Sequence, residues 1–101
     1  MAEKYYLEAL DIDPKYLKAL RGLGQTYVAL DKVPTALKTL EKAVRYHPRA
    51  PLLHFEIAQV YALLKDYKKA LAAYNKVMVL VPNTPLAQEA KEKAVLIENL
   101  K

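Results

Sequence analysis

Apolar residues recur along this chain with the period of a helix. Four of them, spaced three or four residues apart, define one helical face early in the sequence: Leu20, Leu23, Gly24 and Tyr27. The same spacing returns further along, and no stretch alternates as a half-buried strand does. The pattern therefore predicts an all-α protein with helices near residues 2–12, 16–30, 34–46, 52–64, 67–80 and 85–100.

Short polar turns join these predicted helices into pairs. Asp31-Lys32 and Lys65-Asp66 form two of them, and Asp66 is placed to cap the helix that follows. Pro34 falls in the first turn of its helix, where the missing amide hydrogen costs nothing. Three further prolines follow predicted helices and end them, namely Pro14, Pro48 and Pro82. The helices therefore form hairpins.

The hairpins are copies of a 34-residue unit. Residues 17–50 align with 51–84, with identical residues at seven positions in the two copies: Gln25/Gln59, Tyr27/Tyr61, Leu30/Leu64, Ala36/Ala70, Leu37/Leu71, Lys42/Lys76 and Pro48/Pro82. Small residues at positions such as Gly24 and Ala58 allow the two helices of a hairpin to approach closely. No unit of this kind buries its apolar face alone, so neighbouring hairpins must stack.

We interpret the chain as a single domain over residues 1–101. Residues 1–16 supply the second helix of a truncated repeat, residues 17–50 and 51–84 are two repeats, and residues 85–101 form a C-terminal capping helix. This arrangement indicates a piece of a longer array. Tyr5, Tyr6, Leu7 and Leu10 of the first helix would then present apolar surface, from which we expect homodimerisation through the N-terminal end.

Composition narrows the function classes. The 101 residues are 53% hydrophobic and 27% charged, as in folded globular proteins, and include no cysteine. The apolar runs are too short to span a bilayer, and the start lacks the features of a signal peptide, so we expect no membrane segment and a cytoplasmic protein. The net charge is +5, with the excess of bases within residues 15–84.

No group of residues suggests catalysis. His47 and His54 lack a third ligand or an orienting acid, and His54 occupies a core position of its hairpin. Gly22 and Gly24 lack the lysine and hydroxyl of a phosphate-binding loop. We therefore expect no enzyme activity, no metal and no cofactor.

The repeat resembles the tetratricopeptide repeat. Residues 2–84 carry the resemblance, and residues 17–50 match the signature of that family at Leu20, Leu23, Gly24, Tyr27, Ala36, Leu40, Ala43 and Pro48. His54 and Val77 depart from it in the next copy. The resemblance implies a right-handed superhelical solenoid of antiparallel hairpins in which the first helices line a concave groove. It also implies a scaffold or adaptor that binds a peptide or protein segment.

The expected peptide-binding residues lie off the core face of the first helices. They are Lys18, Arg21, Gln25, Leu52, Phe55, Gln59 and Leu63. Phe55 has a second interpretation, in which it packs between neighbouring first helices or against a missing repeat. Some family members clamp acidic chaperone tails with lysine and asparagine on these helices. Here Glu56 and Glu89 would repel such a tail, so we do not expect that clamp.

Three functions remain open. The chain is a protein-binding module, a structural piece that self-associates or stacks in a larger complex, or a binder of acidic polymers or nucleic acid. The third would use bases on the second helices, which are Lys38, Lys42, Arg45, Lys68, Lys69 and Lys76. A protein or peptide ligand is the expected partner, and nucleic acid is not, because the bases are scattered.

Overall fold

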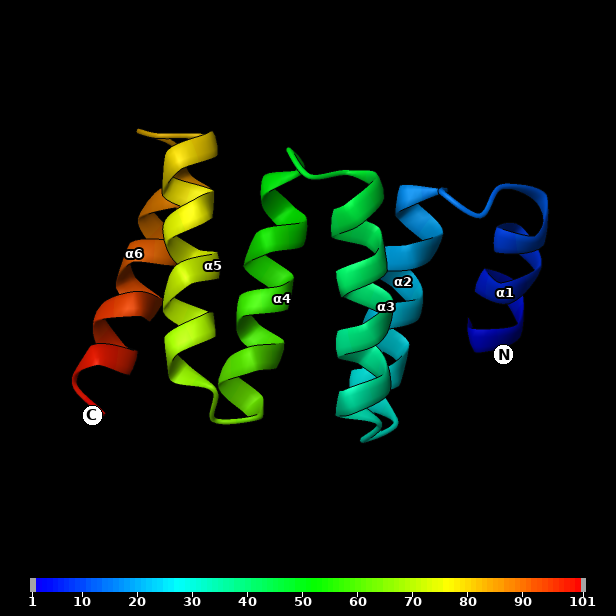
Figure 1. Cartoon of the computed structure of the whole chain (residues 1–101), viewed down its shortest axis with the longest axis horizontal. Helices are drawn as coiled ribbons and strands as arrows, with labels where there is room; N and C mark the ends of the chain where they lie inside the picture. The colour runs from blue at the N-terminus through cyan, green and yellow to red at the C-terminus, as the bar shows by residue number, and fades with distance from the viewer. Residues whose placement is uncertain (1, 101) are drawn as a thin grey trace. The chain divides into compact units, whose positions relative to one another are not determined.

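The computed structural model describes residues 2–100, and this part of the chain is helical without strands (Figure 1). Its helices are α1 (Ala2–Ile12), α2 (Leu17–Ala29), α3 (Val33–Tyr46), α4 (Pro51–Leu63), α5 (Tyr67–Leu80) and α6 (Pro85–Glu98). Each predicted helix is present, and its ends shift by no more than two residues. The prediction of an all-α fold is confirmed.

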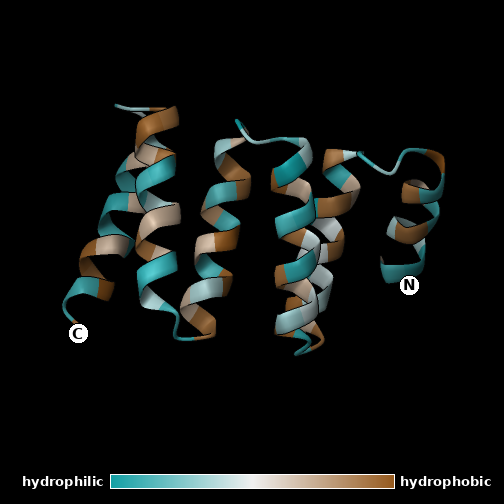
Figure 2. Cartoon of the chain, in the orientation of Figure 1, coloured by the Kyte–Doolittle hydropathy of each residue, from teal (hydrophilic) through white to brown (hydrophobic). Residues whose placement is uncertain are grey.

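The chain divides into two compact units, Met1–Pro48 and Arg49–Lys101. The division falls close to the repeat boundary that the 34-residue alignment places after residue 50. In the first unit α2 packs against both α1 and α3. In the second unit α5 packs against both α4 and α6, and α4 makes a smaller contact with α6. Each helix carries hydrophobic and hydrophilic residues along its length (Figure 2).

Small residues set the closest approach in the first unit. A Cβ on Gly24 of α2 would lie 2.8 Å from Cδ2 of Leu40 on α3, and Leu40 is only 2% exposed. Ala36 and Ala43, on the same face of α3, are fully buried. The repeat pattern predicts this contact, because the position of Gly24 is also small in the second unit, where Ala58 is buried.

The helix α1 lies against α2 through Tyr6 and Glu3. A Cβ on Gly22 would overlap the ring of Tyr6, so only glycine admits the ring at this point. The hydroxyl of Tyr27 donates a hydrogen bond of 3.0 Å to Oε2 of Glu3. Nevertheless α1 contains no buried residue. Its outer face is therefore open in this structure.

The second unit is built around α4, which is buried on most sides. Its residues 53–58 are all buried, because both α5 and α6 contact this helix. Tyr74 and Val77 of α5 close the core from one side, and Ala90 and Ile97 of α6 are buried as the sequence predicts for a capping helix. The second unit is thus a hairpin with a third helix packed on it.

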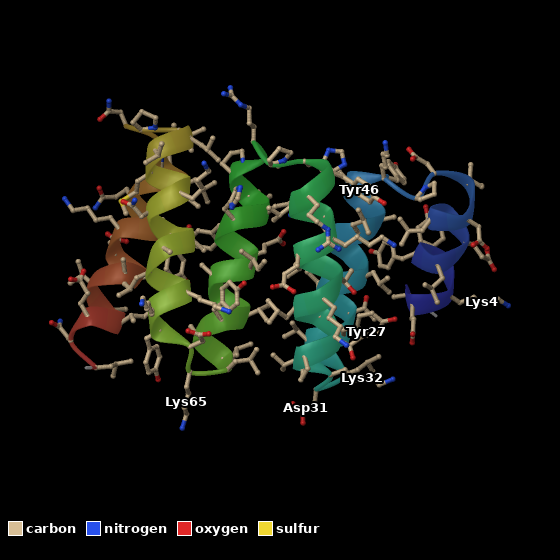
Figure 3. All side chains as sticks on the ribbon, in the orientation of Figure 1. Lys4, Tyr27, Asp31, Lys32, Tyr46 and Lys65 are labelled. Carbon is tan, nitrogen blue, oxygen red and sulfur yellow. The ribbon has the colours of Figure 1, made fainter. Side chains whose placement is uncertain are left out.

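Hairpin turns and helix starts follow the chemistry expected of them. Pro34 lies in the first turn of α3, and the side chain of Asp66 accepts a hydrogen bond of 3.3 Å from the amide of Lys69. Both predictions are confirmed. Asp31, Lys65 and Asn83 adopt the left-handed conformation, with φ of 61°, 62° and 63°. The side chains of Asp31 and Lys65 point away from the helices (Figure 3).

Candidate functional site

The first unit offers part of the predicted binding surface on α2. Lys18 and Gln25 are exposed, and they lie seven residues apart on one side of the helix. Arg21 is half-buried, and both Arg21 and Gln25 already interact with other groups of the protein. Lys18 is therefore the exposed charge on this surface, which is polar and carries a positive charge.

The second unit offers a more apolar surface on α4. Leu52 and Leu63 are 38% and 58% exposed, and Gln59 between them is also exposed. Their spacing of seven and four residues places all three on one side of the helix, over about 16 Å. Exposed leucines flanking an amide provide apolar contact and a hydrogen-bonding group to a segment lying along the helix.

Phe55 does not belong to this surface. It is 5% exposed, and its ring stacks edge to face on Tyr74 of α5, with centroids 5.5 Å apart and planes at 73°. Such an aromatic pair adds about 0.5–1.5 kcal/mol beyond the area that it buries. The expectation that Phe55 contacts a ligand is therefore corrected: this side chain packs the core of the second unit.

Two polar residues of α4 are also enclosed. His54 and Glu56 are each 9% exposed, and each interacts with another group of the protein. A packed, partnered His54 is what the sequence predicts from its core position in the repeat. Glu56 was expected in the groove, where it would repel an acidic ligand, but its burial removes it from the exposed surface of α4.

Two buried or half-buried tyrosines are held in the neutral form. Burial, followed by the hydrogen bond to Glu3 and the charge of its carboxylate, raises the pKa of Tyr27 above 10.0. Burial, followed by the negative charge of Glu89, raises the pKa of Tyr74 above the same value. Both hydroxyls are thus neutral at physiological pH, and Tyr27 acts as a hydrogen-bond donor between α2 and α1.

The described residues contain no metal-binding cluster. In residues 2–100, no group of three or more histidine, cysteine, aspartate or glutamate side chains is placed to hold a metal ion.

None of the helices in residues 2–100 has the length and hydropathy required of a membrane span.

Sequence reasoning missed two exposed leucines at the ends of the first helices. Leu30 and Leu64 follow α2 and α4 directly, and both side chains are more than a third exposed. They are one of the seven identical pairs of the repeat, which is the signal that could have drawn attention to them. Each is an exposed apolar side chain directly after its helix.

The 34-residue period, the hairpins and the small residues at helix contacts agree with one family profile. The profile of the tetratricopeptide repeat matches residues 21–85, which is more than half of the chain. The chain belongs to the tetratricopeptide repeat family. The resemblance stated from the residues alone is thereby confirmed, and the matched residues include most of α2 and all of α3, α4 and α5.

Curated relatives of this tetratricopeptide repeat chain are much longer than it is. Superkiller complex protein 3 of Homo sapiens is 33% identical over 70 residues, which cover 69% of this chain and 4% of that protein. Hsp70-Hsp90 organizing protein 1 of Glycine max is 32% identical over 82 residues, covering 81% of this chain and 14% of that protein. The chain thus corresponds to a small part of each relative.

Solved tetratricopeptide structures share the fold. The TPR2B domain of yeast Sti1, solved as a complex with pHsp70, has a TM-score of 0.89 at 19% identity, over 98% of this chain and 82% of that chain. The chaperone SycD of Yersinia enterocolitica, solved with a peptide of the translocator YopD, has a TM-score of 0.88 at 16% identity, over 97% and 78%. At these identities the likeness establishes the helical hairpin fold alone.

Proposed function

We propose that this chain is a protein-interaction module that binds a peptide or protein segment through the exposed surfaces of its first helices, in a scaffold or adaptor role. The observation that carries the proposal is the pair Leu52 and Leu63, exposed on one side of α4 in a family whose core pattern does not require them there. The solved tetratricopeptide proteins named above are bound to pHsp70 and to a YopD peptide, which supports the same class of function.

The surface on α4 indicates what the ligand looks like. Two leucines about 16 Å apart with Gln59 between them suit a segment with apolar side chains at both ends and a polar backbone or side-chain group between. The surface on α2 belongs to the first unit and is separate: there Lys18 presents a positive charge, which favours a ligand with an acidic residue. We infer no catalytic step, since the proposal requires contact alone.

The test is selection of binders from a random peptide library displayed on phage, with the purified chain as target. Peptides recovered on the native chain should lose about tenfold or more in affinity for the variant Leu52→Lys/Leu63→Lys, since two apolar contacts are replaced by charges. The matched control is Val79→Lys/Leu96→Lys, which changes two apolar residues, 65% and 64% exposed, on α5 and α6 and should bind as the native chain does.

Either of two results contradicts the proposal: a library that yields no binder, or binders that lose equal affinity for both double variants. Phe55→Ala does not serve as a binding variant, because it removes a core ring and costs about 3–5 kcal/mol of stability.

Self-association is a second candidate, and the exposure of α1 favours it. Tyr5 and Ile12 are 69% and 89% exposed, and Leu7 is also exposed, whereas Tyr6 and Leu10 turn toward the unit and are half-buried. Tyr5 and Ile12, seven residues apart, lie on one side of α1 and form the apolar patch, whereas Leu7 is exposed on another side of the helix. We propose that a second copy of the chain covers this patch at high concentration.

Light scattering over a concentration series tests this: the variant Tyr5→Lys/Leu7→Lys should stay monomeric at concentrations at which the native chain dimerises.

A further inference from the structure

A row of basic side chains runs along the exposed side of α3. It consists of Lys38, Lys42 and Arg45, and it is called the α3 basic stripe below. Spacings of four and three residues place the three on one side of the helix, over about 10 Å. All three are exposed, so three positive charges follow one another over two turns of a single helix.

The three bases of the α3 basic stripe outnumber the acids of the same helix. Among the described residues, no carboxylate forms an ion pair with any of the three. The acid on the same helix, Glu41, is half-buried and already interacts with another group. On α5, by contrast, Asp66 lies 4.0 Å from the ammonium of Lys69. The stripe therefore holds three like charges on neighbouring positions, an arrangement that disfavours the helix slightly.

The fold does not account for these charges. A base in the last turn of a helix is favoured by the helix dipole, which explains Arg45 but neither of the two lysines. In the 34-residue alignment, Lys38 and Arg45 correspond to Ala72 and Val79 on the matching helix of the second unit. The repeat thus folds without bases at these two places, and their presence in the first unit calls for another reason.

A fourth cation is fixed at the C-terminal end of the stripe. Lys15 holds its ammonium 5.4 Å from the centroid of the Tyr46 ring, and Tyr46 follows Arg45 directly on α3. The backbone beside it is also held, because Nε2 of His47 donates a hydrogen bond of 2.6 Å to the carbonyl of Lys15. Lys15 is exposed, so its charge extends the positive surface past the end of α3.

We propose that the α3 basic stripe, extended by Lys15, docks an acidic segment of another protein. Charge complementarity selects this partner: four exposed cations outnumber the neighbouring acids Glu41 and Asp13, so they attract carboxylates and raise the rate of encounter. The site lies on a second helix and is distinct from the first-helix surfaces of the proposed function. It therefore provides a second attachment point, at which a partner is recognised by charge.

A nucleic acid fits the stripe less well. Proteins that bind single strands stack bases on exposed aromatic rings along a basic groove. The aromatic residue here, Tyr46, has the ammonium of Lys15 over its ring, so that face is not free for a base. A few surface cations also neutralise only a few phosphates, which supplies little of the electrostatic affinity that nucleic-acid binding depends on.

The experiment measures fluorescence anisotropy of a labelled oligoglutamate peptide of about ten residues, long enough to pass all the charges of the stripe. It uses the full chain at physiological ionic strength, where long-range charge is screened within about 8 Å. The test variant is Lys38→Gln/Lys42→Gln/Arg45→Gln. The matched control, Lys68→Gln/Lys76→Gln/Lys91→Gln, removes the same net charge from exposed positions on α5 and α6. Circular dichroism checks that both triple variants remain helical. If the stripe variant is not helical, the single variant Lys38→Gln takes its place in the binding measurement.

The stripe variant should bind the peptide about tenfold or more weakly than the native chain, and the control variant within about twofold of it. Equal losses in the two triple variants would show that only net charge matters, and would overturn the proposal. So would a native chain that does not bind the peptide at all. An oligothymidylate of the same length that binds more tightly than the peptide, and depends on the stripe, would assign the surface to nucleic acid instead.

Discussion

The close contact between α2 and α3 leads to a quantitative prediction for Gly24→Ala. The added Cβ would lie 2.8 Å from Cδ2 and 2.9 Å from Cγ of Leu40, where carbon atoms need about 3.5–4.0 Å. Leu40 is almost fully buried and cannot swing into solvent, so the helices must separate or the leucine must leave its rotamer. Overpacking of this kind costs about 1–3 kcal/mol, against a gain of about 1 kcal/mol from the better helix propensity of alanine.

The net expected loss is therefore about 1 kcal/mol, or about 4–8 °C in Tm for a chain of this size. Gly24→Leu should lose about 3 kcal/mol, because three more carbons enter the same space. Urea unfolding followed by far-ultraviolet circular dichroism measures both variants.

The decisive control is the same change in the variant Leu40→Ala. With the leucine side chain removed, Gly24→Ala should become stabilising by about 1 kcal/mol, because only the helix propensity remains. The reverse change in the second unit, Ala58→Gly, should destabilise by about the same amount through lost propensity. If Gly24→Ala stabilises the native chain as much as it stabilises the Leu40→Ala variant, then Leu40 does not limit the approach of the helices, and the packing argument is wrong.

Three further predictions concern polar contacts. Tyr27→Phe removes the hydrogen bond to Glu3 and should lower the unfolding free energy by about 1 kcal/mol, measured by urea unfolding, with no further loss when Glu3→Gln is added. Asp66→Ala removes the cap of α5 and should lower the free energy of unfolding by about 1 kcal/mol, whereas Asp66→Asn should retain most of the capping contribution. Equal losses of stability in the two variants would exclude a capping role. Because the pKa of Tyr74 is raised in the folded state, the stability it contributes is complete below pH 10 and is lost as the pH rises through its folded pKa. Alkaline unfolding should therefore be shallower in Tyr74→Phe, and an unchanged pH profile would contradict this.

The sequence predicted the helices and their closest contact because these depend on local spacing. The three- and four-residue period of apolar side chains fixes which face packs, and glycine or alanine at a crossing is required by geometry alone. Pro34 and Asp66 act within one helical turn of their own positions, so their roles also follow from neighbouring residues.

The binding surface was less predictable, because it depends on how many helices contact each element. The assignment of Phe55 and Glu56 to a surface assumed that α4 packs on one face, whereas α5 and α6 enclose it on more than one. A periodic pattern shows which face of its helix each residue occupies. It does not show whether a third helix covers the face next to the one that packs in the hairpin. The contact of Tyr6 with Gly22 was missed for the same reason, since it joins two helices from different repeats.

The left-handed residues at the hairpin turns leave room for engineering. Such a conformation costs a residue with a side chain about 1–2 kcal/mol, whereas glycine adopts it freely and asparagine at a lower cost. Asn83 suits its place, but Lys65, with φ of 62°, does not. Lys65 points into solvent at the end of its hairpin, far in the sequence from the α3 basic stripe (Figure 3). A glycine there would raise the thermal tolerance of the scaffold without replacing any residue of the proposed contact surfaces, although Leu63 lies two residues away, so peptide binding is the property to check after the change.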